Sequence, residues 1–160
     1  MQIGMIYQIQ VPKPWTPTSD FDRYWEMMDQ VVLAEELGFG SVWLADHQFR
    51  TEWSHSSAPD VTLGAISQRT SRIRLGIAVA VPPVEHPLHI AARTATLDIL
   101  SNGRVDLGVG RSGYPYQMAA FGTDLANATG MVDEALEIIP RAWTEGEFSY
   151  QGEYFDIPPR

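Results

Sequence analysis

Residues 73–109 read IRLGIAVAVPPVEHPLHIAARTATLDILSNGRVDLGV. The run 73–81 is apolar and rich in β-branched residues, which predicts a buried strand that ends at a pair of prolines. A proline suited to the first helical position then opens a helix over 87–100, and Asn102-Gly103 ends it. Residues 104–109 form the next apolar strand. Strand, helix and strand in this order make a βαβ unit, with parallel strands and a right-handed crossover.

The same alternation continues towards both ends of the chain. The further elements expected are strands at 3–9 and 41–45, helices beginning at Ser19, Pro59 and Ala128, and a small hairpin at about 147–157 around Gln151-Gly152. The last helix is expected to reach Trp143, with Pro140 kinking or ending it because proline removes a backbone hydrogen bond. Four strand–helix units in a row predict an α/β fold with parallel strands. We expect residues 1–160 to form one domain.

The composition restricts the classes of function. Acidic residues outnumber basic ones by 20 to 11, for a formal net charge of −9, and Lys13 is the only lysine, which argues against a nucleic-acid partner. The chain has no cysteine, which excludes disulfides, a thiolate nucleophile and cysteine-ligated metal. No apolar run approaches the ~18 residues of a membrane span, and the N-terminus lacks the layout of a signal peptide. We expect a cytoplasmic protein without membrane contact.

His47 is the first candidate for a functional residue. Ligands of parallel α/β sheets bind beyond the carboxyl ends of the strands, and His47 follows the second strand. An imidazole takes or gives a proton near neutral pH. Asp46 supplies a carboxylate beside it in sequence, although neighbouring strand residues point to opposite faces and need not touch. The alternative is a hydrogen-bonded structural histidine, and the position at a strand end favours catalysis.

A glycine pattern follows the fourth strand. Residues 108–113 read GVGRSG, which matches the G-x-G-x-x-G pattern of dinucleotide-binding proteins. The next residues, Tyr114-Pro115-Tyr116, stand where that motif requires a running helix, which argues against a dinucleotide-binding fold. Glycines still let a backbone approach a ligand closely, and Arg111 offers a planar guanidinium for phosphate. The alternative for Arg111 is a surface ion pair.

The other histidines have simpler interpretations. His86 precedes the helix that begins at Pro87, and His89 lies one turn later on the same side. No third ligand has a suitable spacing, so a helix cap and a core contact are preferred to a metal site, and we expect no metal. His55 lies in a polar run that either covers a site or is simply solvated, and we favour the second interpretation.

Several blocks of the sequence resemble the bacterial luciferase-like flavin monooxygenases. The first, GFGSVWLADH at residues 38–47, is similar to the second-strand signature of that family. Further blocks follow in the same order: HPL at 86–88, LDILSNGR at 97–104, GVGR at 108–111, FGTD at 121–124 and GEYF at 152–155. The resemblance covers residues 1–160 and implies a TIM-barrel-type fold. About four βα units are present, which corresponds to the N-terminal half of a (β/α)8 barrel, or to a truncated one.

The resemblance also implies roles for individual residues. His47 matches the active-site acid/base of luciferases, and Arg111 matches a residue near the flavin phosphate. Ala78-Val79 fall where the family places a cis peptide against the flavin ring. Gly110 lies in the same flavin-side loop, at the position of a reactive cysteine in luciferases, and Gln48 replaces a second histidine. These two departures argue against light emission and against a long-chain aldehyde substrate.

The activity implied by the resemblance is that of a flavin-dependent monooxygenase. Reduced FMN from a separate flavin reductase and oxygen would oxygenate a small organic substrate, with His47 managing protons. A deazaflavin-dependent hydride-transfer enzyme of the same superfamily is the alternative.

The number of βα units raises a question of partners. A TIM barrel usually has ~250 residues and eight units, and the open strand edges of half a barrel need pairing. We expect either a homodimer or a separate chain that supplies the second half. A non-catalytic half-barrel that needs such a partner is the alternative from a different functional class.

Overall fold

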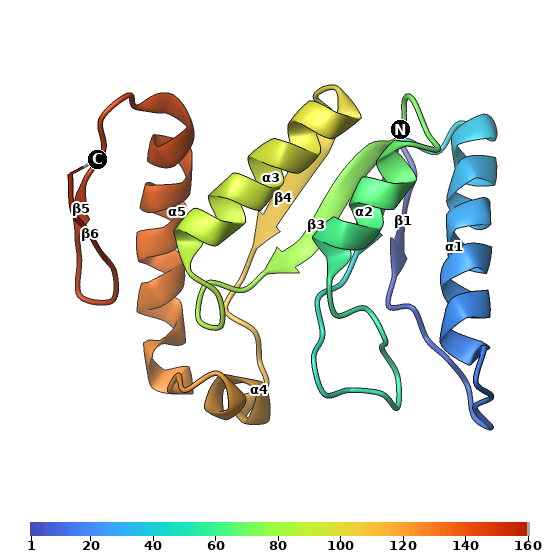
Figure 1. Ribbon diagram of the computed structural model, residues 1–160, viewed down its shortest axis with the longest axis horizontal. Coiled ribbons are helices and arrows are strands. Elements are labelled where there is room, and N and C mark those ends of the chain that lie inside the picture. The colour runs from blue at the N-terminus through green and yellow to red at the C-terminus, as the bar shows by residue number, and fades with distance from the viewer. Residues whose placement is uncertain (160) are drawn as a thin grey trace. The chain divides into compact units, whose positions relative to one another are not determined.

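The computed structural model describes residues 1–159 (Figure 1). The elements are β1 (Gly4–Tyr7), α1 (Ser19–Glu36), β2 (Ser41–Leu44), α2 (Pro59–Ser67), β3 (Arg74–Ala80), α3 (Pro87–Ser101), β4 (Val105–Val109), α4 (Pro115–Ala120), the short 3-10 helix η1 (Leu125–Asn127), α5 (Ala128–Thr144), β5 (Tyr150–Gln151) and β6 (Asp156–Ile157). The predicted strands and long helices are all present and begin or end within about two residues of the expected positions.

The first four strands form one sheet in the order β1-β2-β3-β4, which confirms the predicted α/β fold. β2 pairs parallel with both β1 and β3, in a register that sets Leu44 beside Tyr7 and Ile77. The carboxyl ends of the three strands therefore lie along one edge of the sheet. The chain divides into two compact units, the first made of residues 1–79 and 97–108 and the second of residues 80–96 and 109 onward.

The two faces of the sheet in the first unit differ in burial. Val42, Leu44 and Leu75 have no exposed surface and belong to the core. Residues that alternate with them point to the opposite face, where Ile6 is 60% exposed. The register places the following residues on that second face, called the open face below: Gly4, Ile6, Ser41, Trp43, Arg74 and Gly76. A parallel sheet is normally covered on both faces, so the open face is a surface that lacks a cover.

Small and large side chains alternate on the open face. A Cβ atom on Gly76 would collide with the ring of Trp43, and one on Gly4 would collide with Ser41 Oγ. The indole Nε1 of Trp43 donates a hydrogen bond to Ser41 Oγ at 3.1 Å. The two glycines thus leave the space that their neighbours on β2 fill, which is the kind of layered packing found inside a barrel.

Arg104 connects the ends of two helices to the sheet. It is 8% exposed, and Nε donates to the carbonyl of Ser101 at 2.7 Å, at the end of α3. Its two Nη atoms donate to Ser67, Thr70 and Ile73, which follow one another from the end of α2 to the start of β3. The guanidinium satisfies carbonyls that a helix end leaves without partners, and its charge opposes the negative end of each helix dipole.

Glu35 holds the connection between α2 and β3 in a similar way. Its carboxylate accepts hydrogen bonds from the backbone N–H groups of Ser71 at 3.0 Å, Arg72 at 2.6 Å and Ile73 at 2.7 Å. Burial alone would raise the pKa of Glu35, but the three N–H groups and the charge of Arg72 outweigh it and lower the pKa to about 2. The folded protein therefore prefers the ionised carboxylate.

Glu35→Gln is expected to lower the free energy of unfolding at pH 7 by about 1–3 kcal/mol, because an amide oxygen binds three N–H groups less strongly than a carboxylate. The stabilising effect of the charge is complete above pH 4.5, the ordinary pKa of glutamate, and is lost as the pH falls towards 2. Urea unfolding of the wild type and the variant between pH 7 and pH 3 measures both effects. Glu36→Gln, at an exposed neighbouring position, is the control. Identical pH dependence in wild type and Glu35→Gln would contradict the prediction.

The second unit contains the elements that differ from the sequence prediction. The last helix extends to Thr144, which confirms the expected end near Trp143. Pro140 lies inside α5, so of the two outcomes expected for this proline, ending the helix is excluded. Proline removes only its own N–H, and both Pro140 and Leu136 are exposed, so water can bind the carbonyl that loses its donor. The short helices α4 and η1 were not expected. β5 and β6 pair antiparallel, with residues 152–155 forming the turn.

Glu134 fixes that terminal hairpin to α5. Its carboxylate accepts hydrogen bonds from the backbone N–H groups of Glu153 at 2.7 Å, Tyr154 at 3.2 Å and Phe155 at 3.0 Å. Phe155 and Ile157 pack with Ile138 of α5 in a small buried cluster. The hairpin is therefore attached both by a charged group and by apolar contact.

Candidate active site

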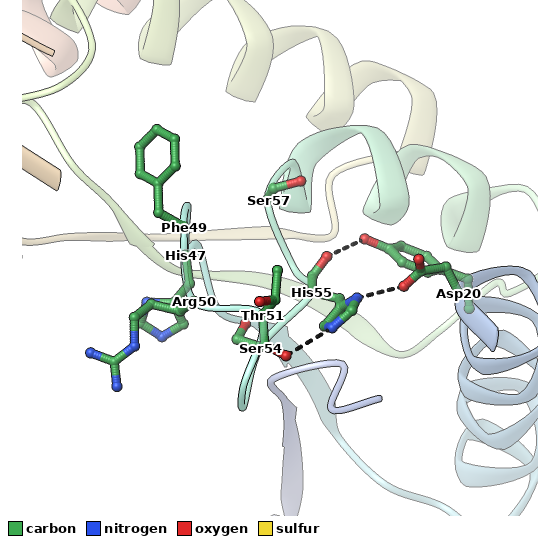
Figure 2. A pocket seen from close by; sticks show the side chains of 9 residues that line it. Asp20, His47, Phe49, Arg50, Thr51, Ser54, His55 and Ser57 are labelled. Carbon is green, nitrogen blue, oxygen red and sulfur yellow. Dashed lines mark hydrogen bonds and ion pairs between the residues drawn. The ribbon is translucent and has the colours of Figure 1, made fainter. Parts of the chain in front are cut away.

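A cavity of about 310 Å³ lies in the first unit (Figure 2). Asp20 and Tyr24 of α1 form one side of the cavity. Residues 46–58, which lie between β2 and α2 and are called the pocket loop below, provide the rest of the wall. The lining residues are Asp20, Tyr24, His47, Phe49, Arg50, Thr51, Ser54, His55 and Ser57. His47, the predicted acid/base, is thus part of a cavity at the carboxyl end of β2.

The surroundings of His47 keep its imidazole neutral. Its ring centroid lies 4.7 Å from that of Trp53, and the guanidinium of Arg50 lies 4.8 Å from the Trp53 ring. Burial lowers the pKa of His47 below its ordinary value, and the positive charge of Arg50 lowers it further. At neutral pH the ring is therefore mostly in the form that accepts a proton.

The neighbours of His47 in sequence contact each other. Gln48 Nε2 donates to Asp46 Oδ1 at 2.5 Å and to the carbonyl of Ser57 at 3.5 Å. Gln48 is the residue that stands where luciferases have a second histidine. In this chain it connects the two ends of the pocket loop.

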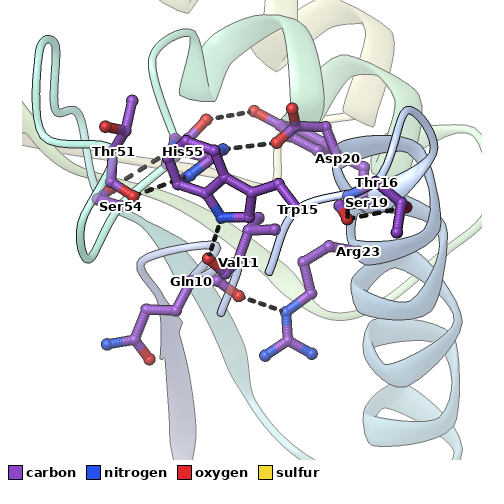
Figure 3. Close-up of polar contacts among 12 residues, drawn as sticks. Gln10, Val11, Trp15, Thr16, Ser19, Asp20, Arg23, Thr51, Ser54 and His55 are labelled. Atoms are coloured by element: carbon purple, nitrogen blue, oxygen red, sulfur yellow. Dashed lines mark hydrogen bonds and ion pairs between the residues drawn. The ribbon is translucent and has the colours of Figure 1, made fainter. Parts of the chain in front are cut away.

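The opposite side of the cavity is formed by His55 and its partners (Figures 2 and 3). His55 Nδ1 lies 2.5 Å from Asp20 Oδ1, and Nε2 lies 3.0 Å from the carbonyl of Thr51. Tyr24 donates its hydroxyl proton to the carbonyl of His55 at 2.8 Å, and Trp15 packs edge-on against the His55 ring at 5.4 Å. His55 therefore lines the cavity with both ring nitrogens in contact, rather than lying free in solvent.

The residues predicted to bind the cofactor lie at the ends of β3 and β4. The bond between Ala78 and Val79, in β3, is a cis peptide, as the resemblance implies for this position. Gly110 follows β4, and its N–H donates to the carbonyl of Ala80 at 2.9 Å. The side chain of Arg111, the next residue, is exposed. Gly110 and Arg111 belong to the second unit.

Gln8 provides an independent test of whether a flavin fits this edge of the sheet. Its side-chain Oε1 is buried and has no hydrogen-bond partner among the described residues. Gln8 directly follows β1, at the edge of the sheet where His47 follows β2 and where Ala78-Val79 form the last part of β3 before Ala80. Buried acceptors normally have a donor. A flavin ring carries an N–H group that would supply one, so the residues present fit this cofactor.

Most of the cavity wall was not predicted. His47 was predicted because it directly follows a strand, whereas Asp20, Tyr24, Arg50 and Ser54 have no comparable signal in the sequence. The interpretation of the polar run around His55 as solvated is wrong, since His55 lines the cavity and is paired with Asp20. Two serines of this run, Ser54 and Ser56, are buried, which its polar composition does not indicate.

The predicted helix cap is confirmed for His86, whereas the core contact expected of the second histidine is wrong, since His89 is exposed. His86 lies directly before α3, and its Nδ1 accepts a hydrogen bond from the backbone N–H of Leu88 at 3.2 Å. Its ring also packs edge-on against Phe155 at 5.3 Å. Within residues 1–159 there is no group of three or more His, Asp or Glu side chains that could hold a metal ion. None of the helices in that range is long and apolar enough to cross a membrane.

Comparison with known proteins gives relatives of several activities. The chain is 37% identical over 140 residues to the F420-dependent glucose-6-phosphate dehydrogenase of Microbacterium testaceum, covering 82% of this chain and 41% of that protein. The crystal structure of monooxygenase RslO1 from Streptomyces bottropensis superposes with a TM-score of 0.90 at 30% identity, covering 99% of this chain and 48% of that one.

A third similar protein was solved with its cofactor. It is the oxygenating constituent of 3,6-diketocamphane monooxygenase from Pseudomonas putida in complex with FMN, with a TM-score of 0.87, 25% identity, and coverage of 98% of this chain and 42% of that one. The chain spans less than half the length of each of these three proteins. The likeness confirms the predicted TIM-barrel-type fold. The family model of the luciferase-like monooxygenases matches residues 1–160. This chain therefore belongs to the luciferase-like monooxygenase family.

Proposed function

We propose that this chain supplies the acid/base side of a flavin-dependent monooxygenase that uses reduced FMN and oxygen to oxygenate a small organic substrate. The observation that supports it best is the position of His47, half-buried in a cavity at the carboxyl end of β2 and neutral at physiological pH. Ligands bind at that edge in parallel α/β folds. The oxygenating constituent of 3,6-diketocamphane monooxygenase, which superposes on this chain with a TM-score of 0.87, was solved in complex with FMN.

Each residue of the site has a part in this proposal. Bound reduced flavin supplies the electrons and the reaction with oxygen. A ring nitrogen of His47 takes a proton from the substrate or returns it, and the Trp53 ring shields that imidazole from water. Gln8 Oε1, which is buried and has no partner among the described residues, would accept a hydrogen bond from a flavin N–H group. We assign Ala78, Val79, Gly110 and Arg111 to cofactor binding, with the Arg111 guanidinium suited to the phosphate.

The experiment that tests the proposal follows the oxygen atom. The protein is supplied with reduced FMN from a flavin reductase, ¹⁸O₂ and a panel of small organic substrates, and products are examined by mass spectrometry. A product that carries ¹⁸O supports a monooxygenase. Absence of label from every product, in a sample that binds FMN, would contradict it.

A deazaflavin-dependent hydride transfer is the second candidate, favoured by the 37% identity to an F420-dependent dehydrogenase. In that reaction His47 would remove the proton of an alcohol while a hydride leaves its carbon. The same panel with F420 and without oxygen distinguishes the two candidates, because hydride transfer reduces F420 and needs no O₂.

The pH profile of activity is expected to show the lowered pKa of His47. An ordinary histidine titrates at about 6.5, so a rate that depends on neutral His47 remains high down to a pH below that value. The acidic limb of kcat/KM, measured between pH 4.5 and 8, should therefore have its midpoint below about 6.5. A midpoint at or above about 6.5 would show that a group other than a histidine with a lowered pKa must lose its proton, and would contradict the prediction.

We propose two partners, a flavin reductase and a second half-barrel. The reductase is supported by the similar protein that is the oxygenating constituent of its enzyme. The second half-barrel is supported by the open face, where the side chain of Ile6 is 60% exposed and lacks the cover that a barrel interior provides. A second copy of this chain or a separate chain of the same architecture has the required shape, and closure would form a single luciferase-like domain.

Pairing between copies is expected to depend on the open face. At micromolar concentration, light scattering should give twice the mass of one chain, and Ile6→Glu should return it to the mass of a monomer because a charge is buried at the interface. Ile99→Glu is the control, since Ile99 is 79% exposed and lies on α3. A wild-type chain that remains monomeric would contradict pairing between copies.

A further inference from the structure

Two buried serine hydroxyls attach the pocket loop to the sheet. Ser54 is 2% exposed and Ser56 is 1% exposed. Ser54 Oγ donates to the carbonyl of Gln8 at 2.8 Å, beyond the end of β1, and Ser56 Oγ donates to the carbonyl of Ala45 at 2.5 Å, beyond the end of β2. A loop between a strand and a helix usually lies on the surface, so two buried hydroxyls within three residues are a specific feature of this one.

The same serines determine where His47 lies. The backbone N–H of His47 donates to the carbonyl of Ser56 at 2.8 Å, and the N–H of Ser56 donates to Ser54 Oγ at 3.3 Å. Ser56 is thus hydrogen-bonded to both Ala45 and His47, through its hydroxyl to the first and through its carbonyl to the second. Breaking the contact between Ser56 Oγ and Ala45 would therefore free the backbone partner of His47 as well.

The loop also places Trp53 against the imidazole. The N–H groups of Trp53 and Ser54 both donate to the carbonyl of Arg50, at 3.1 and 2.9 Å, which forms a tight turn. The turn sets the Trp53 ring 4.7 Å from the His47 ring, tilted by 53°. Ser54, at the end of this turn, is the residue whose hydroxyl holds it to β1.

We propose that Ser54 and Ser56 are positioning residues for His47, acting through the loop backbone and through the Trp53 ring that they hold over the imidazole. The proposal deepens the proposed function, because it rests on His47 being the acid/base. The geometry itself does not depend on that role. Ser54 also lines the cavity, but the hydroxyls of both serines donate to backbone carbonyls, and their proposed effect reaches the reaction through His47.

The charged groups near the imidazole of His47 have partners of their own, which supports a role for the Trp53 ring that covers this imidazole. Arg50 is on the pocket loop itself, and Asp20 of α1 is paired with His55. Asp46 is hydrogen-bonded to Gln48. Since burial is the larger cause of the lowered pKa of His47 and the charge of Arg50 the smaller, removing the cover should raise that pKa towards its ordinary value.

The test is a histidine NMR titration of the full chain without cofactor or substrate. Trp53→Ala and Ser56→Ala are expected to move the His47 midpoint upward by about 0.5–1 pH unit, while Trp53→Phe, which keeps an aromatic cover, stays near the wild type. Ser57→Ala is the control on the same loop, since Ser57 is exposed. If Ser56→Ala does not fold, Ser54→Ala and the two Trp53 variants decide the question.

Two results together would overturn the proposal. One is an unchanged His47 midpoint in a folded serine variant, Ser56→Ala or Ser54→Ala, and the other is an unchanged midpoint in Trp53→Ala. Because the titration needs no activity, its outcome is separate from that of the proposed function. A shifted midpoint together with a His47→Ala variant that retains turnover would keep the positioning role and reject the acid/base role. Unchanged midpoints together with a large loss of turnover in His47→Ala would reject the positioning role and keep the acid/base role.

Discussion

His47→Ala is expected to lower kcat/KM by about 10²–10⁴-fold, the usual contribution of a positioned acid/base side chain. The loss should appear mainly in kcat, because the imidazole acts on the reacting proton rather than on substrate affinity. The measurement uses the substrate that gives an ¹⁸O-labelled product with reduced FMN. His47→Gln should lower kcat/KM by as much as His47→Ala does, since an amide forms hydrogen bonds but does not take up a proton at neutral pH.

The control for this prediction is His89→Ala. His89 is an exposed histidine of α3, outside the cavity, so its replacement removes an imidazole without affecting the site. Turnover should remain within about twofold of the wild type, in keeping with the small effects of most surface substitutions. If His47→Ala also retained wild-type turnover, the cavity at the end of β2 would not be the acid/base site.

Arg104→Ala is expected to lower the free energy of unfolding by about 3–5 kcal/mol. The side chain is 8% exposed and donates five hydrogen bonds, four of them to backbone carbonyls. Its removal leaves those acceptors without a donor at the ends of α2 and α3. Urea unfolding followed by circular dichroism measures the difference.

Two further variants separate the causes of this effect. Arg104→Lys keeps the charge but not the planar set of N–H donors. It should therefore lower the free energy of unfolding by less than Arg104→Ala does and by more than a surface substitution does. Arg69→Ala removes an exposed arginine that pairs with Asp29 at 2.7 Å, and it should cost about 0–1 kcal/mol. A loss from Arg104→Ala as small as that from Arg69→Ala would contradict a central role for the buried guanidinium.

The order of the helices and strands could be predicted because each boundary carries a local signal. Gly38 and Gly103 end their helices with φ of +86° and +78°, a conformation that glycine adopts at little cost. α4 has six residues, too few to show a helical period. Pro140 lies on an exposed face of α5, where water has access to the carbonyl of Leu136, and the sequence pattern around this proline does not show that exposure.

The site could be predicted only in part, for a related reason. His47 directly follows a strand, and that position alone indicates the carboxyl edge of the sheet. The wall around it depends on contacts between distant parts of the chain. Ser54 reaches a carbonyl 46 positions away and His55 pairs with a carboxylate 35 positions away. No local pattern indicates that a serine or histidine will find such a partner.

The central claim is that the strand ends around Gln8 and His47 bind a flavin. The most direct measurement is a titration of the purified protein with FMN and with F420, followed by cofactor fluorescence, on a sample whose mass is determined by light scattering. We expect saturable quenching with FMN, weakened by Gln8→Leu because the N–H group of the flavin ring then has no acceptor at this position. A sample with the mass of a paired barrel that shows no saturable change with either cofactor would contradict the claim.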